Sequence, residues 1–162
     1  MAITKEKKQG IISKLEDVLK TSNSVVFVNF NKLLVKDASE IRRSLKKEGV
    51  GYTVAKKSLI KRVFSGSSTK GELPSLDGEI ALAFGEDLLS PAREIFGFQK
   101  KMDGKLNIVG GIYDGEYKNK EEMMVIASIP SVDVLRGMFV NIINSPIQRF
   151  AIALNQIAEK KA

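Results

Sequence analysis

The sequence has no cysteine and no histidine among its 162 residues. Disulfide bonds, thiol nucleophiles, a histidine general base and zinc sites of the usual ligand types are therefore excluded. Long hydrophobic runs are also missing, because the most apolar stretch, near the carboxyl end, carries two arginines, three asparagines and a proline. We therefore expect no segment that spans a bilayer. No apolar run follows residues 1–5, so we expect no secretory signal.

What remains is the composition of a globular protein, with 43% hydrophobic and 28% charged residues. A chain of this length accommodates one ordinary domain plus an appendage. Residues 67–71 lack the residue order of a phosphate-binding P-loop, and nothing positions the carboxylates of Glu86 and Asp87 for catalysis. The sequence therefore predicts a protein that is not an enzyme and that needs no metal or cofactor.

Charge is distributed unevenly along the chain, whose formal net charge is +7. Residues 1–70 have 16 basic and 6 acidic side chains, a net charge of +10, whereas residues 71–129 have 6 and 11, a net charge of −5. Residues 130–162 have 4 and 2, a net charge of +2. A basic first part followed by an acidic middle favours a polyanionic partner on one side of the protein, although a solvated lysine-rich surface has the same composition.

Helical and strand patterns alternate along residues 1–130. Apolar residues spaced three and four apart predict five helices: Thr4–Lys20, Asp37–Glu48, Ser58–Phe64, Ser90 to about Met102, and a short helix after Asn119 that ends at Ala127. β-Branched and aromatic runs predict four strands: Ser24–Phe30, Val50–Val54, Glu79–Phe84 and Leu106–Val109. The first strand is expected to be buried on both faces, and the last to end before the glycine pair 110–111. The alternation predicts one α/β domain, whose sheet order the pattern leaves open.

Some helix starts have specific capping signals. Thr4 is suited to cap the first helix. Ser90 is suited to cap the fourth helix, with Pro91 at its first helical position. Asn119 and Glu122 have the spacing of a capping box, which predicts where the short helix begins.

Residues 131–162 predict a second unit that consists of one helix from Val132 to about Lys160. At 1.5 Å per residue, such a helix spans roughly 40 Å. Pro146 interrupts the pattern and predicts a bend. Most of the apolar residues fall on one stripe of the helix.

The stripe contains a short internal repeat with a spacing of 11 residues. Phe139 and Phe150 lie 11 residues apart, and an asparagine follows each of them by five residues. Eleven residues make almost three whole helical turns, so the two copies present the same face. The tail therefore reads as two similar docking segments, Leu135–Ser145 and Pro146–Ile157, although two amphipathic turns also resemble each other by chance.

Three explanations compete for the apolar stripe: burial against the α/β domain, adsorption to a membrane surface, and binding of partner helices. The globular domain already has helices enough to cover a four-stranded sheet. A membrane-surface helix has lysines along its polar face, whereas the polar face here is nearly neutral. Binding of partner helices therefore fits best.

Basic residues gather at two helix starts and late in a third helix. At a helix start, free backbone N–H groups, hydroxyls and ammonium groups can together hold a phosphate, and few aromatic residues lie nearby for base stacking. The positions of Lys46 and Lys47 are explained by the helix dipole, because it favours cations late in a helix. The candidate RNA contacts are Lys5, Lys7, Lys8, Arg42, Arg43, Lys56, Lys57, Ser58, Lys61 and Arg62. Solvated faces remain the alternative for each cluster.

Several segments, in this order and spacing, together resemble the family of the bacterial large-subunit ribosomal protein ten, which forms the base of the ribosomal stalk. The resemblance covers nearly the whole chain and rests on residues 24–28, the helix 35–47, the stretch 52–60, residues 76–83, the junction 126–131 and the end 157–161. The stretch 52–60 is similar to the family's V-x-K-N-T-L motif. It departs from that motif by having Lys57 and Ser58 where the family has Asn-Thr.

The resemblance implies a ferredoxin-like α/β sandwich with a mixed sheet over residues 1–130, bound to 23S rRNA beside ribosomal protein eleven. It also implies that the helix of residues 131–162 binds dimers of the acidic stalk protein, two per chain, which recruit translation GTPases on the cytoplasmic ribosome. The stalk-binding residues would be Leu135, Met138, Phe139, Ile142, Ile143, Ile147, Phe150, Leu154 and Ile157. The alternative is a free RNA- or DNA-binding regulator that forms homodimers through its C-terminal helix.

Overall fold

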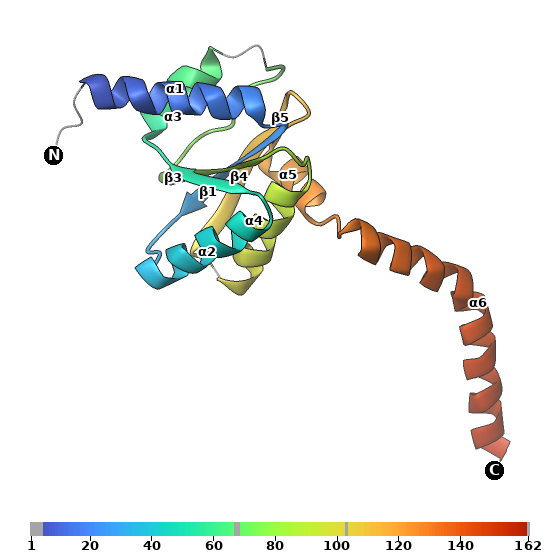
Figure 1. Cartoon of the computed structure of the whole chain (residues 1–162). Helices are drawn as coiled ribbons and strands as arrows, with labels where there is room; N and C mark the ends of the chain where they lie inside the picture. The colour runs from blue at the N-terminus through green and yellow to red at the C-terminus, as the bar shows by residue number, and fades with distance from the viewer. Residues whose placement is uncertain (1–4, 67–68, 103, 162) are drawn as a thin grey trace. The chain divides into compact units, whose positions relative to one another are not determined.

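A computed structural model describes residues 5–66, 69–102 and 104–161 of the chain (Figure 1). The chain divides into two compact units, residues 1–129 and residues 130–162, and each is considered by itself. The first unit is built around one sheet, and the second consists mainly of one helix.

The sheet has five strands: β1 (Ser24–Phe30), β2 (Gly51–Val54), β3 (Glu79–Gly85), β4 (Leu106–Tyr113) and β5 (Glu116–Asn119). Their order is β2-β3-β1-β4-β5, and each pair of neighbours is antiparallel. β1 and β2 run in the same direction with β3 between them, and β3 and β4 do so with β1 between them. This double split β-α-β arrangement is that of ferredoxin-like folds. The α/β fold class is therefore confirmed.

The expected mixed character of the sheet is wrong, because all four ladders are antiparallel. The physical reason is that each crossover helix leaves room for one strand, and a strand running the opposite way fills that room. Within the described residues, parallel pairing is limited to an isolated bridge between Lys70 and Glu116.

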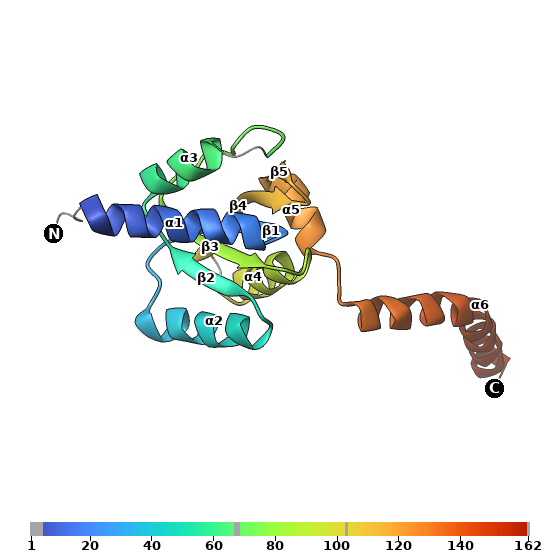
Figure 2. The same cartoon turned by 45° about the horizontal axis from the view of Figure 1, so that its top comes forward.

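Helices cover both faces of the sheet. α1 (Lys5–Thr21) and α3 (Lys57–Ser65) lie on one face, and α2 (Val35–Lys47), α4 (Ser90–Lys101) and α5 (Lys120–Ala127) lie on the other (Figures 1 and 2). These elements match the predicted helices to within a few residues at each end. Thr4, the predicted cap of the first helix, lies outside the described residues.

The central strand β1 joins two apolar cores, as its continuous apolar sequence predicts. Val25 and Phe27 point to the α1 and α3 side, where they pack with Leu15 and Phe64 among others. Val26 and Val28 point to the other side and pack with buried residues of α2, α4 and α5: Ile41, Leu45, Ala92, Ile95, Phe98, Met123 and Ala127. Burial of β1 on both faces is therefore confirmed.

β4 runs past the glycine pair that was expected to end it. The two glycines are needed inside the ladder, because a Cβ on Gly111 would lie 2.5 Å from the backbone oxygen of Val25. The register between β1 and β4 also shifts next to Gly110, which is typical of a β-bulge. After a turn at residues 114–115 the chain returns as β5, a strand that the sequence pattern did not predict because its four residues are mostly polar.

Two capping predictions have different outcomes. The capping box of Asn119 and Glu122 is present at the start of α5 and is confirmed. Ser90 is not the cap of α4, since Leu89 occupies that position and Ser90 is the first helical residue. The Ser90 hydroxyl donates instead to the Asp87 carboxylate, and this hydrogen bond is the main reason why the pKa of Asp87 is lowered.

The second unit contains α6 (Val132–Lys161), a helix of 30 residues with Pro146 inside it. Its ribbon changes direction part-way along its length (Figure 1). None of the described helices is by itself long and apolar enough to cross a membrane, and α5 and α6 meet the length and composition criteria only when taken together across the break between them.

Candidate functional site

The start of α3 presents backbone N–H groups that no side chain caps. The extended backbone of Lys56 (φ −63°, ψ 132°) leads from β2 into the helix, and no acidic residue lies in the first turn. The carbonyl oxygen of Lys56 accepts from the backbone N–H groups of Leu59 (2.9 Å) and Ile60 (3.1 Å). A helix start with open N–H groups and flanking lysines attracts anions, because the helix dipole and the side-chain charges have the same sign.

The body of α3 is anchored firmly in the core. Leu59, Ile60 and Phe64 are buried, and the Phe64 ring packs edge-on against Phe27 with 5.2 Å between ring centroids. The Tyr117 hydroxyl on β5 donates to the carbonyl oxygen of Phe64 over 2.7 Å. The basic side chains of α3 are therefore displayed from a helix whose position is set by packing.

Four of the predicted contact residues line one groove. Lys56, Lys57, Ser58 and Lys61 surround an open groove of about 840 Å³, with apolar lining from α1, β1, β2 and the segment before β3. Lys57 and Lys61 thus share a face, as their spacing of four residues predicts. Like charges so placed repel each other unless an anion lies between them.

A turn directly before β3 also lines this groove, and the sequence pattern did not predict that it would. Asp77 and Glu79 line the groove together with the lysines. The Asn29 side-chain amide holds the turn by donating to the carbonyl oxygen of Asp77 over 2.6 Å. Gly78 has φ +75°, which favours glycine. An Asp-Gly pair before a strand signals such a turn, but only the tertiary structure brings it to α3.

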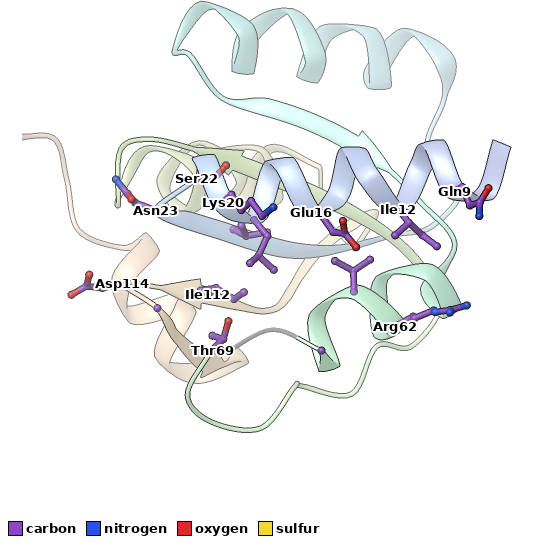
Figure 3. Close-up of a pocket in the computed structure, with 15 residues that line it drawn as sticks. Gln9, Ile12, Glu16, Lys20, Ser22, Asn23, Arg62, Thr69, Ile112 and Asp114 are labelled. Atoms are coloured by element: carbon purple, nitrogen blue, oxygen red, sulfur yellow. The ribbon is translucent and has the colours of Figure 1, made fainter. Parts of the chain in front are cut away.

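Arg62 lies in a different pocket from the lysines. This pocket, of about 900 Å³, is lined by α1, α3 and the turn between β4 and β5 (Figure 3). Glu16 from α1 and Asp114 from the turn also line it, so Arg62 lies in mixed electrostatic surroundings.

The remaining candidates are spread over both layers of helices. Lys7 and Lys8 are exposed on α1, in the same layer as α3, and the side chain of Lys5 is not described. Arg42 and Arg43 lie on α2, on the opposite face of the sheet (Figure 1). The ten candidates therefore do not form one surface, because α2 and α3 cover opposite sides of the sheet.

Arg42 and Arg43 also point in different directions, since neighbouring helical residues are about 100° apart. The Arg42 guanidinium lies over the Tyr52 ring, 6.0 Å from its centroid. Burial raises the pKa of Tyr52, and the charge of Arg42 opposes that rise. Arg43 is exposed and lines a groove between α2 and α4.

α6 exposes every apolar side chain that the sequence predicts to bind a partner. All nine side chains of the stripe are 42–70% exposed. A 30-residue helix of this kind has too few residues in its own unit to cover the stripe. Exposed apolar surface of this extent marks a binding site for another molecule or another surface.

Among the described residues, no group of three or more histidine, cysteine, aspartate or glutamate side chains could hold a metal ion. What the arrangement offers chemically is anion binding at the start of α3 and apolar docking along α6. Neither is a catalytic arrangement.

Two family models and several known proteins match the chain. The family model described as "Ribosomal protein L10" matches residues 3–100, and the model "Ribosomal protein uL10 C-terminal region" matches residues 129–162. The chain is 34% identical over 157 residues to "Large ribosomal subunit protein uL10" of Staphylococcus carnosus. The aligned residues are 96% of this chain and 94% of the relative.

Proteins of the same name in two other organisms are also similar. The protein of Shouchella clausii is 32% identical over 157 residues, covering 96% of this chain and 94% of the relative. That of Bacillus cereus strain ATCC 14579 is 31% identical over 162 residues, covering 99% and 97%. The chain therefore belongs to the uL10 family, whose members are structural, non-enzymatic proteins of the large ribosomal subunit.

Proposed function

We propose that the chain forms the base of the ribosomal stalk, with its globular unit bound to 23S rRNA and its C-terminal helix bound to dimers of the acidic stalk protein. The observation that carries this proposal is the apolar stripe of α6, whose nine side chains are 42–70% exposed. On this proposal the protein lies beside ribosomal protein eleven in the cytoplasmic ribosome, and translation GTPases are recruited through the stalk rather than by this chain.

The rRNA part of the proposal is supported by the groove at the start of α3. Lys56, Lys57 and Lys61 line it together, and the adjacent helix start has open backbone N–H groups. Phosphate contacts of this kind position a protein on RNA without reading bases. The groove has little aromatic surface exposed for stacking, which favours recognition of the RNA backbone and shape.

Salt dependence tests the rRNA part. Affinity for 23S rRNA should fall steeply with KCl concentration, with a log–log slope of about −0.7 to −0.9 for each phosphate neutralised. The double substitution of Lys56→Ala and Lys57→Ala should flatten this slope by about 1 to 2, measured by filter binding. An unchanged slope would remove these two lysines from the contact set.

The stalk-binding part of the proposal is supported by the internal repeat of 11 residues in α6. Leu135–Ser145 and Pro146–Ile157 each carry a phenylalanine at the corresponding position, and both phenylalanines are exposed. Each segment has the length and apolar face of a helix that docks in a hydrophobic groove. We therefore infer that each segment binds one dimer, two per chain.

Stoichiometry tests the stalk part. Native mass spectrometry of the full chain mixed with acidic stalk protein should give two dimers per chain. Deletion of residues 146–162 should reduce this to one. Two dimers on the shortened chain would contradict the segment boundaries, and homodimers of the chain that ignore the stalk protein would instead support a free nucleic-acid-binding regulator.

A further inference from the structure

A second basic groove lies between α2 and α4, on the face of the sheet opposite α3. It has a volume of about 650 Å³, and four cations line it: Lys36, Arg43 and Lys47 from α2, and Lys101 from α4. Glu40 is the one carboxylate among its lining residues. The groove therefore has a net formal charge of +3.

The α2 side of the groove is a continuous charged stripe. Residues 36, 40, 43 and 47 are spaced four, three and four apart, so they share one face of the helix. The opposite face of α2 carries Ile41 and Leu45 into the core, which sets the direction of the stripe. The cations from Lys36 to Lys47 extend over about 16 Å of helix, given a rise of 1.5 Å per residue.

The four cations have little compensation by opposite charge, and the ammonium group of Lys101 instead lies over the Phe98 ring, 5.6 Å from its centroid. In the part of the chain that the structure describes, no ion pair within 4.0 Å involves Lys36, Arg43, Lys47 or Lys101. The other carboxylate early in α2, Asp37, pairs instead with Lys105 at 3.6 Å. Arg43 and Lys47 lie four residues apart, where like charges destabilise a helix.

Position late in a helix explains the basic residues of α2 only in part. The helix dipole favours Lys46 and Lys47, but Lys36 lies in the first turn, where a cation is disfavoured. Lys101 belongs to another helix and comes to the groove only through the packing of α4 against α2. Convergence of cations from two helices on one groove indicates an anionic ligand.

We propose that this groove binds the sugar–phosphate backbone of rRNA, as a second RNA site on the opposite side of the globular unit from the α3 groove. The proposal rests on the rRNA binding proposed above. Charged side chains dominate the lining, since Val35 is the one exposed apolar residue among the lining residues and Phe98 is buried. Such a lining suits phosphates better than it suits a protein partner, whose interfaces centre on clusters of exposed apolar anchors.

Two sites on opposite faces have a consequence for how the RNA is held. A five-stranded sheet separates α2 and α4 from α1 and α3 (Figures 1 and 2). The two grooves therefore contact separate stretches of RNA backbone, and the globular unit lies between them.

The test is a charge-neutralised variant of the full chain, with Lys36, Arg43, Lys47 and Lys101 each replaced by Gln. Its binding to full-length 23S rRNA is measured by filter binding over a range of KCl concentrations. We expect at least tenfold weaker binding near 0.1 M KCl and a log–log slope that is flatter by about 2 to 3. Circular dichroism checks that the variant is folded, which is expected because all four side chains are exposed.

The matched control removes the same number of charges elsewhere. Lys14, Lys32, Lys70 and Lys120 are exposed and line neither groove, and each is replaced by Gln. This control should change the slope by less than about 1. Equal slopes for the groove variant and the control would overturn the second site.

Two further outcomes separate this inference from the proposed function. If the Lys56→Ala, Lys57→Ala variant flattens the slope while the groove variant does not, the proposed rRNA binding stands and the second site is wrong. If polyglutamate binds the wild-type chain but not the groove variant, and RNA binding is the same in both, the groove takes an acidic protein and the RNA assignment is wrong.

Discussion

At the scale of single residues, close packing decides several positions that local pattern does not. Gly111 is the clearest example, because it lies inside β4 where a glycine pair was expected to end the strand. A Cβ there would lie 2.5 Å from the backbone oxygen of Val25 and 2.8 Å from the Met123 side chain. The glycine allows β4 to approach β1 while α5 packs on top.

Gly111→Ala should therefore lower the free energy of unfolding by about 1–3 kcal/mol, since the added methyl group forces the ladder or Met123 to shift. Gly97→Ala is the matched control. Gly97 lies in α4 with nothing within 4 Å of its Cβ position, so alanine should stabilise the protein by roughly 0.5–1 kcal/mol. Urea unfolding followed by circular dichroism measures both, and equal effects of the two substitutions would contradict the packing argument.

At the scale of elements, α3 and α6 show how the same kind of pattern leads to different degrees of burial. Both are amphipathic helices, but the apolar side of α3 is buried against β1 and leaves its lysines outside. The apolar side of α6 is exposed along the whole helix. Helical periodicity predicts an apolar stripe on each helix. Whether that stripe is buried depends on which other elements pack against it.

Phe139→Asp and Phe150→Asp should each weaken binding of acidic stalk protein by at least about 2 kcal/mol, roughly thirtyfold in Kd, because each removes an aromatic anchor. The control is Ile152→Asp. Ile152 is also exposed but lies about 200° around the helix from Phe150, so this change should leave the affinity within a few fold. Isothermal titration calorimetry provides the measurement. Unfolding of the globular unit by either phenylalanine substitution would show that the stripe belongs to its core.

At the scale of the whole molecule, the two units divide the chemistry between them. The buried apolar residues of the described chain all lie between Leu15 and Ala127, within the first unit. The exposed apolar stripe lies entirely within the second unit. The anion binding and apolar docking that we propose therefore involve separate parts of the chain.

Removal of residues 130–162 should therefore leave the thermal unfolding midpoint of the remaining unit within a few degrees of that of the full chain, because no buried apolar side chain is lost. The shortened chain should also keep its salt-dependent affinity for 23S rRNA and lose all binding of stalk protein. Differential scanning calorimetry and filter binding check the two parts. A large fall in the midpoint would mean that α6 contributes to the core.

The α/β alternation, the burial of β1, the capping box of α5 and the long C-terminal helix can all be predicted from the amino-acid sequence. Each of these features depends on residues that lie close together along the chain. The sequence also carries the family resemblance, which the comparisons confirm. Short-range pattern is enough for such features.

Three features depend on how the elements pack together: the antiparallel strand order, the continuation of β4 through its glycines, and the separation of the basic residues onto two faces of the sheet. The same packing also brings Asp77 and Glu79 to the α3 groove and Lys101 to the stripe on α2. These features depend on contacts between residues tens of positions apart, which only the packing of the completed sheet and its helices brings together.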